Sequence, residues 1–169
     1  MTTLYLARHG ETVDNVNNIM QGQTPGKLNE NGIAQAHELA AAMEGTHFDA
    51  FMASDLKRAV DTCRIVAAPH GMDVDTTPLL RERDWGSFTG RPIPNLATEE
   101  WPDDIETIGE MKERARQFLR LVSKKYPGKV VFAVGHGIIN KAVQAVFYGK
   151  DIKEIKRMEN AEVRVLELP

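Results

Sequence analysis

Short continuous apolar runs alternate along the chain with longer stretches in which apolar residues recur at helical spacing. The runs at residues 4–7 and 129–134 lack polar alternation and are too short for helices, which is typical of strands buried in a parallel sheet. Further strands are predicted at residues 48–53, at 74–76 near a sheet edge, and at 162–168, where apolar and polar residues alternate. Helices are predicted at residues 29–45, 54–68, 105–125, 138–148 and 151–158.

Three segments between these elements lack periodicity. Residues 14–26 are rich in Asn, Gln and Gly, which predicts a loop over the edge of the sheet. Residues 78–90 mix charges, aromatic side chains and glycines, and we expect an ordered loop there. The Pro-rich residues 91–102 indicate a loop or small lid, with Trp101 as its anchor. At the start of the second helix, Ser54 or Asp55 is expected to be the N-cap.

The composition indicates one globular domain spanning residues 1–169. With 42% hydrophobic residues, 169 residues suffice for one core and are too few for two domains. The net charge of −3 comes from interspersed charges, so neither nucleic acid nor a membrane is an expected partner. Cys63, the sole cysteine, is expected to be a buried, inert thiol. Because we find neither a membrane-spanning stretch nor a signal peptide, the expected location is the cytoplasm.

Two of the buried strands end in a histidine followed by a glycine. Arg8, His9 and Gly10 follow the first apolar run, and His136 and Gly137 follow the strand at 129–134. Strand ends of this kind build the sites of open α/β sheets. Gly10 is expected to permit a tight turn and to leave the space over the imidazole of His9 free. For His9 alone a structural role is as good an interpretation as catalysis, but two unrelated structural histidines would rarely repeat this pattern.

The segment from Arg8 to Thr12, Arg-His-Gly-Glu-Thr, resembles the signature of the histidine phosphatase superfamily, in the branch that includes cofactor-dependent phosphoglycerate mutases. The resemblance extends over essentially the whole chain in family order. The other matching elements are the Ser-x-x-x-Arg-Ala motif ending at Ala59, the Leu-x-Glu element ending at Glu82, the glycines Gly86 and Gly90, and His136-Gly137. It implies a phosphoglycerate mutase-like α/β fold, a three-layer α/β/α sandwich with a mostly parallel central sheet.

The resemblance also implies the roles of individual residues. His9 would be the nucleophile and form a phosphohistidine, while Glu82 would be the acid and base. Phosphate contacts would come from Arg8, Arg58, His136, Asn15, Gln21, Gly22 and the backbone N–H of Gly137. The residues alone leave other interpretations open, since Asn15 could be an ordinary turn residue, Arg58 a solvated charge, and Glu11 or Asp84 the acid.

The chemistry of the two arginines agrees with phosphate binding. Planar guanidinium groups chelate phosphate oxygens, and they repel divalent cations. We therefore expect a metal-independent site without a cofactor. The other histidines, His37, His47 and His70, are interpreted as structural or solvated.

The expected activity is that of a histidine acid phosphatase-type phosphomonoesterase that releases inorganic phosphate from a small phosphorylated metabolite. True mutases of the family are longer, with a larger insertion before the second histidine and a C-terminal tail, whereas here residues 82–136 are compact and the chain ends soon after its last strand. The alternatives are phosphoglycerate mutase-type transfer, since Glu82-Arg83-Asp84-Trp85-Gly86 resembles the mutase pattern, and a non-catalytic phosphate-binding protein. An α-ribazole-phosphate-type phosphatase is one near comparison. Phosphosugars, phosphoglycerates and nucleotides all stay open as substrates.

Three departures from the family pattern affect substrate contacts more than phosphoryl transfer. Ile138 replaces a small or polar residue after His136-Gly137. Residues 109–111, Gly-Glu-Met, replace the common Gly-Glu-Ser, so Glu110 is not assigned a substrate contact. Residues 25–28, Pro-Gly-Lys-Leu, replace an Asp-x-Pro-Leu turn. The sequence carries no prediction of oligomeric state.

Overall fold

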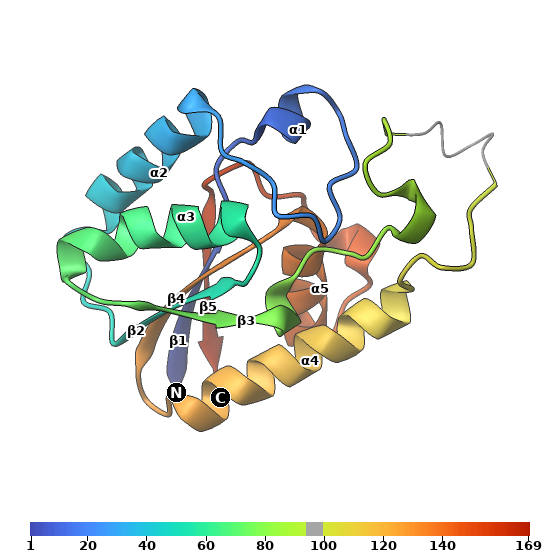
Figure 1. Ribbon diagram of the computed structural model, residues 1–169. Coiled ribbons are helices and arrows are strands. Elements are labelled where there is room, and N and C mark those ends of the chain that lie inside the picture. Colours follow the sequence, from blue (N-terminus) through green and yellow to red (C-terminus); the bar gives the residue numbers. More distant parts are fainter. Residues whose placement is uncertain (94–99) are drawn as a thin grey trace.

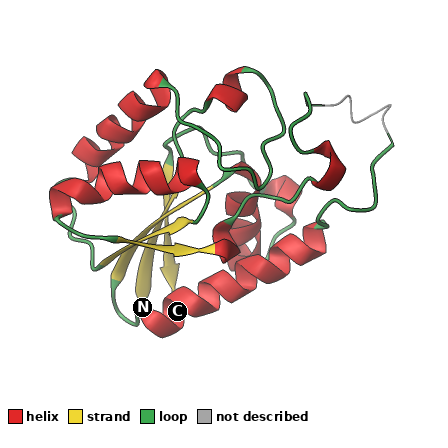
Figure 2. Cartoon of the chain, viewed as in Figure 1, coloured by secondary structure: helices red, strands yellow, loops and turns green. Residues whose placement is uncertain are grey.

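One mixed sheet runs through the centre of the molecule (Figures 1 and 2). The computed structural model describes residues 1–93 and 100–169, and within them five strands pair in the order β3-β2-β4-β1-β5. All neighbouring pairs are parallel except β1 and β5, which are antiparallel. The strands are β1 (Thr2–Arg8), β2 (Ala50–Ser54), β3 (Val74–Thr77), β4 (Val130–Gly135) and β5 (Val163–Leu168). The expected mostly parallel sheet, with the 74–76 strand at its edge, is confirmed.

Helices cover both faces of this sheet. In Figure 1, α2 (Glu30–Met43) and α3 (Lys57–Ala67) lie above it, whereas α4 (Ile108–Lys125) and α5 (Gly137–Tyr148) lie on the other side. Because neighbouring strand residues point to opposite faces, Phe51 joins the core under α2 and α3 while Met52 joins the core under α4 and α5. The three-layer α/β/α sandwich is therefore confirmed.

Several boundaries differ from the sequence prediction. The one-turn helix α1 (Val13–Val16) overlaps the start of the predicted 14–26 loop. The expected helix at 151–158 is reduced to the 3-10 turn η4 (Ile152–Glu154). The 78–90 loop is ordered and carries the 3-10 turns η2 (Pro78–Leu80) and η3 (Gly86–Phe88), and a further turn, η1 (Ala68–His70), extends α3.

The predicted N-cap of α3 is wrong. The cap position is Leu56, whose side chain cannot accept a hydrogen bond from the helix. Ser54 instead accepts from the backbone N–H of Leu56 and lies against His136, and Asp55 forms an ion pair with Arg81. Both polar side chains therefore have tertiary partners that compete with capping.

The predicted lid at residues 91–102 lies partly outside the described residues, since 94–99 are not described. Trp101, expected as its anchor, packs against Trp85 and Phe88, with ring centroids 5.6 Å and 6.0 Å apart. These rings border the small apolar cluster of Met20, Phe88 and Ile105. A lid function stays a prediction.

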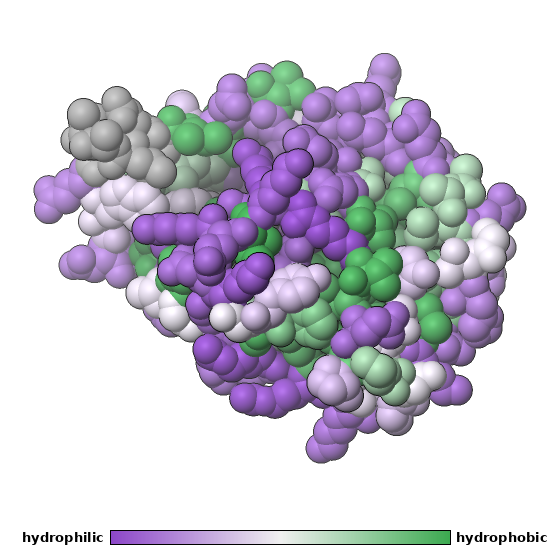
Figure 3. All heavy atoms as spheres, turned by 180° about the vertical axis from the view of Figure 1, so that it is seen from behind, coloured by the Kyte–Doolittle hydropathy of each residue, from purple (hydrophilic) through white to green (hydrophobic). Residues whose placement is uncertain are grey.

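The cysteine and the three histidines that were not assigned to the site lie in ordinary core or surface positions. Cys63 is buried and donates to the carbonyl oxygen of Met52, and burial raises the pKa of its thiol. His37 and His47 are exposed, and the His70 ring packs on Phe51. In the described part of the chain, no helix has the length and apolar character to span a membrane, and the face shown in Figure 3 is mostly hydrophilic.

Candidate active site

The two His-Gly segments meet at the carboxyl edge of the sheet. Arg8 ends β1 and Gly135 ends β4, and the two residues are register partners of neighbouring parallel strands. The following residues, His9 and His136, therefore emerge side by side, with ring centroids 5.0 Å apart and planes at 62°. Both histidines are buried. The sheet thus joins two motifs that are far apart in the sequence.

His9 is held as one tautomer. Its Nδ1 lies 2.7 Å from the carbonyl oxygen of Gly10, and since a carbonyl only accepts, Nδ1 carries the proton and donates. The other ring nitrogen, Nε2, then has its lone pair free. Burial and the charge of Arg58, followed by that of Arg8, hold the pKa of His9 well below its usual value. The imidazole is therefore neutral and has an available electron pair.

His136 lies directly behind this ring. Its Nε2 is 2.8 Å from Oγ of Ser54, while its buried Nδ1 has no partner among the described residues. Burial lowers the pKa of His136 well below its usual value, and the positive charge of Arg58 adds to this effect. Ser54 therefore orients the second histidine, which was not anticipated when Ser54 was interpreted as a cap.

Arg8 and Arg58 present buried guanidinium groups to the histidines. Arg8 Nη1 donates to the carbonyl oxygen of Met158 at 2.8 Å, and Arg58 Nη2 donates to that of Gly22 at 2.8 Å. Among the described residues neither arginine forms an ion pair, and the Nε atoms of both have no partner. Burial lowers the pKa of Arg58 to about 10 and also lowers that of Arg8, so both stay charged at neutral pH. Buried, unpaired cations favour an anion.

Glu82 faces these cations from the loop between η2 and η3. Its Oε1 accepts from the backbone N–H groups of Ile139 and Arg83, at 3.0 Å and 2.9 Å, and its Oε2 accepts from that of Ile138 at 3.1 Å. The carboxylate therefore sits at the N-terminus of α5, where the helix dipole favours negative charge. Gly137 and Ile138, the first two residues of that helix, line the cavity.

A cavity of about 380 Å³ brings the expected site residues together. Every one of them except His136 lines it: Arg8, His9, Asn15, Gln21, Gly22, Arg58, Glu82 and Gly137. Asn15 also has the turn role left open by the sequence, because its side chain and Thr12 form a capping box at α1. Sequence reasoning did not anticipate Lys141 and Arg157, which line the same cavity.

The structure shows a further reason for a glycine at position 10, whereas free space over the imidazole of His9 stays a prediction. A Cβ atom at this position would lie 2.5 Å from the carbonyl oxygen of Gly32, in the first turn of α2. The glycine is needed because two backbone segments cross in close contact. At Gly137 a Cβ atom would meet Cζ of Arg8 at an ordinary 3.5 Å.

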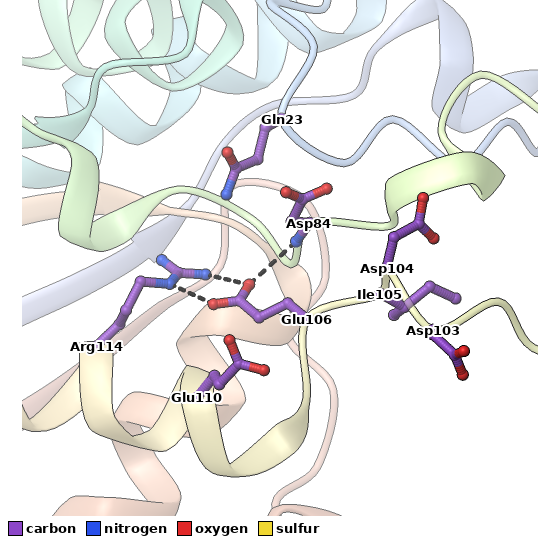
Figure 4. A pocket seen from close by; sticks show the side chains of 8 residues that line it. All are labelled: Gln23, Asp84, Asp103, Asp104, Ile105, Glu106, Glu110 and Arg114. Carbon is purple, nitrogen blue, oxygen red and sulfur yellow. Dashed lines mark hydrogen bonds and ion pairs between the residues drawn. The ribbon is translucent and has the colours of Figure 1, made fainter.

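A second, open pocket behind Glu82 contains an ion pair that the sequence analysis missed. Arg114 and Glu106 line this pocket and contact each other directly, and Glu106 also accepts from the backbone N–H of Asp84 (Figure 4). Glu110, which was not assigned a substrate contact, lines this pocket and belongs to the capping box of α4. The only hint in the sequence is an arginine beside the apolar stripe of α4.

Metal binding has no support in the described part of the chain, where no group of three or more His, Cys, Asp or Glu side chains is placed to hold an ion. The ligand set at the cavity is dominated instead by guanidinium groups and neutral imidazoles. Such donors suit an anion. Metal independence stays a prediction.

Comparison with known proteins agrees with this geometry. The profile of the histidine phosphatase superfamily (branch 1) matches residues 4–169. The chain belongs to this superfamily. Among histidine phosphatase relatives, the uncharacterized phosphatase PhoE of Bacillus subtilis (strain 168) is 34% identical over 155 residues, covering 89% of this chain and 80% of that protein.

Two further relatives differ in the share of their length that this histidine phosphatase chain covers. The probable phosphoglycerate mutase GpmB of Yersinia pestis (strain Pestoides F) is 40% identical over 100 residues, which are 59% of this chain and 46% of that protein. The solved structure of mycobacterial glucosyl-3-phosphoglycerate phosphatase with VO3 has a TM-score of 0.88 at 26% identity, covering 98% of this chain and 92% of that one. The whole fold is therefore shared with a phosphatase.

Proposed function

We propose that this chain is a phosphomonoester hydrolase that removes phosphate from a small phosphorylated metabolite through a phosphohistidine on His9. The observation that carries the proposal is the placement of His9, whose Nδ1 donates to Gly10 and leaves the lone pair of Nε2 available, beside two buried guanidinium groups that form no ion pair among the described residues. A nucleophile with an available lone pair and two cations for the phosphate oxygens are the groups that phosphoryl transfer needs.

In the first step Arg8 and Arg58 bind the nonbridging phosphate oxygens, and Nε2 of His9 attacks phosphorus in line with the leaving oxygen. The P–N bond forms as the ester P–O bond breaks, and the carboxylic acid of Glu82 transfers its proton to the departing alkoxide. His136 hydrogen-bonds the phosphoryl group during transfer.

In the second step water attacks the phosphohistidine. Glu82, now a carboxylate, takes a proton from this water, the P–N bond breaks, and inorganic phosphate leaves. The glutamate is thereby returned to its acid form and His9 to its neutral form, so the cycle closes without a metal or cofactor.

A small substrate is supported by the cavity volume of about 380 Å³. The related mycobacterial protein is a phosphatase of a glycosylated phosphoglycerate by its name. We extend to this chain the class of small phosphorylated metabolites, and not that particular compound. That residues 1–169 act as one domain, and do so in the cytoplasm, stays a prediction.

Mutase-type transfer is the second candidate, and the similarity to the probable mutase GpmB favours it. A mutase must protect its phosphohistidine from water until a second substrate arrives. The two functions therefore differ in the fate of the phosphoryl group.

The test is phosphate release from a panel of phosphomonoesters by the wild-type protein and by His9→Ala, each with and without a chelator. Turnover that is insensitive to chelator and lost in His9→Ala is the expected result. Exchange between 2- and 3-phosphoglycerate without phosphate release would favour the mutase, and activity lost with chelator would contradict the metal-free site. If the protein shows neither phosphate release nor exchange, the remaining alternative is a non-catalytic phosphate-binding protein.

A further inference from the structure

The hydroxyl group of Ser54 connects the end of β2 with the second histidine. Ser54 is fully buried, and His136 follows β4, the parallel neighbour of β2 in the sheet. The Oγ atom of Ser54 accepts from the backbone N–H of Leu56 at 3.2 Å and lies 2.8 Å from Nε2 of His136. Among the described residues, the Ser54 side chain has no other hydrogen-bond partner. The mechanism proposed above gives this hydroxyl no role.

The proton of this hydroxyl has a single acceptor within reach. A serine hydroxyl carries one proton, and its oxygen already accepts from Leu56. Burial and the positive charge of Arg58 keep the pKa of His136 well below its usual value, so the ring is neutral and one of its two nitrogens has a lone pair. Since no carbonyl or carboxylate oxygen of the described residues accepts from Ser54, its proton is directed at Nε2 of His136.

The two tautomers of His136 leave different numbers of buried groups unpaired. If Ser54 donates to Nε2, the ring proton is on Nδ1, and this N–H is the one group without a partner. If Nε2 donates to Ser54 instead, both the hydroxyl proton and the lone pair of Nδ1 are unpaired. Each buried polar group without a partner costs free energy, so the contacts favour the tautomer with its proton on Nδ1.

This tautomer gives the neutral ring a free hydrogen-bond donor and no free acceptor. The His136 ring packs against that of His9, with centroids 5.0 Å apart, and Gly137 beside it lines the cavity. A phosphate oxygen accepts hydrogen bonds, so an Nδ1–H group attracts it, whereas a lone pair on Nδ1 would repel it. The tautomer therefore decides whether the uncharged second histidine binds or repels a phosphoryl group.

We propose that Ser54 is a positioning residue that fixes the tautomer of His136, so that the neutral second histidine donates a hydrogen bond from Nδ1 to the bound phosphoryl group. The hydroxyl acts through the imidazole, and Ser54 does not line the cavity itself. The donor role of Nδ1 rests on the proposed function, whereas the tautomer follows from the contacts of Ser54 and is tested separately.

NMR spectroscopy of ¹⁵N-labelled wild-type protein measures the tautomer directly. Two-bond couplings between the ring nitrogens and the carbon-bound ring protons distinguish a protonated nitrogen from an unprotonated one. The spectrum of His136→Asn assigns the signals. We expect a protonated Nδ1 and an unprotonated Nε2 in His136, and the reverse would overturn the proposal before any variant of Ser54 is made.

Variants then test whether Ser54 is the cause. In Ser54→Ala the donor to Nε2 is lost, and we expect His136 to change to the tautomer with its proton on Nε2 or to a mixture of the two. Ser54→Thr retains the hydroxyl and should retain the wild-type tautomer. Thr2→Val is the matched control, because it also removes a buried hydroxyl, which donates to the carbonyl oxygen of Tyr126 at the other end of β1. If Ser54→Ala does not fold, Ser54→Gly takes its place.

Titration of the same samples with inorganic phosphate tests the donor. The probe is not turned over, and the shifts of the histidine ring signals give its affinity. We expect Ser54→Ala to bind phosphate about tenfold more weakly than the wild type, which corresponds to the loss of one hydrogen bond to a charged ligand. Ser54→Thr and Thr2→Val should bind it as the wild type does.

The outcomes separate the two proposals. A tautomer that is unchanged in Ser54→Ala, an unchanged phosphate affinity, or an equal loss of affinity in Thr2→Val overturns the role of Ser54, even if the protein hydrolyses phosphomonoesters. A tautomer and a phosphate affinity that both depend on the Ser54 hydroxyl support it even if no ester is hydrolysed, in which case the hydrolase proposal fails alone. If the wild-type protein does not bind phosphate, both proposals fail.

Discussion

The guanidinium group of Arg114 and the carboxylate of Glu106 form a two-point ion pair, with N–O distances of 2.7 Å and 2.8 Å. The same guanidinium donates to the carbonyl oxygens of Leu79 and Arg81, and the same carboxylate accepts from the backbone N–H of Asp84. These contacts lie on either side of Glu82. The pair therefore fixes both ends of the segment that carries the proposed acid, although neither residue lines the phosphate cavity.

Replacing Arg114 should displace the acid more than the nucleophile. We expect Arg114→Met to slow hydrolysis of an alkyl phosphate by about 10- to 100-fold in kcat, because proton transfer from Glu82 depends on its position. p-Nitrophenyl phosphate should be affected much less, since its leaving group departs without a proton. Arg116→Met, on the exposed side of the same helix, is the control. An equal loss with both substrates would contradict a positioning role.

Replacing Glu82 itself should reduce kcat more than replacing Arg114 does, and the loss should again depend on the leaving group. Glu82→Gln keeps a carbonyl oxygen that accepts from the start of α5 but cannot supply a proton at this position. We expect kcat for alkyl phosphates to fall by about 10²- to 10⁴-fold, with a smaller loss for p-nitrophenyl phosphate. Steady-state rates with both esters check this prediction. If the variant hydrolyses both esters at the wild-type rate, a residue other than Glu82 is the acid.

Stability should decrease as the solution becomes acidic. His9 and His136 have pKa values well below that of an unfolded histidine, about 6.5, because both are buried beside Arg58. Below that pH the unfolded chain binds protons that the folded chain does not, so the free energy of unfolding falls. The slope is about 1.4 kcal/mol per pH unit for each histidine.

Urea unfolding at pH 7.5, 6 and 5 measures this slope. His136→Asn should remove about half of the histidine contribution to the slope, whereas replacement of the exposed His37 by Asn should leave it unchanged. A pH-independent free energy of unfolding over this range would show that the two imidazoles are not buried in their neutral form.

The close contact between Gly10 and the start of α2 predicts that replacing this glycine by alanine lowers the free energy of unfolding more than the same change at Gly45. Gly10→Ala would place a methyl group 2.5 Å from a carbonyl oxygen of Gly32, and we expect the free energy of unfolding to fall by about 1–3 kcal/mol. Gly45→Ala, which meets nothing within 4 Å, should not lower it. Chemical denaturation of both variants makes the comparison, and equal stabilities would contradict the close crossing.

The sequence predicted the parts of this site that depend on local patterns. The runs ending in His9 and His136 mark two strands, and pairing of those strands as parallel neighbours brings the histidines together. The role of Ser54 could not be predicted, because its hydroxyl serves as a partner of His136 across the sheet instead of capping the helix that follows. The capping rule considers only neighbours in the sequence, whereas the hydroxyl of Ser54 is used in a contact with His136 that is distant in the sequence.

Arg114 and Glu106 escaped prediction for a similar reason. Their pairing involves a helix, the preceding segment and backbone carbonyl groups of a distant loop, and main-chain carbonyls leave no trace in the pattern of side chains. The contact between Gly10 and Gly32 could not be predicted either, because the approach of α2 to the end of β1 is a property of the packed layers.

Glu82 is anchored to the first turn of α5, the helix that begins directly after His136. The glutamate and the second histidine consequently share one support, although 54 positions separate them along the sequence. During refolding, Glu82 reaches its working place only when the 78–90 segment docks against the β4–α5 unit. Recovery of enzymatic turnover would then report the docking of these two segments, which the return of helical signal alone does not report.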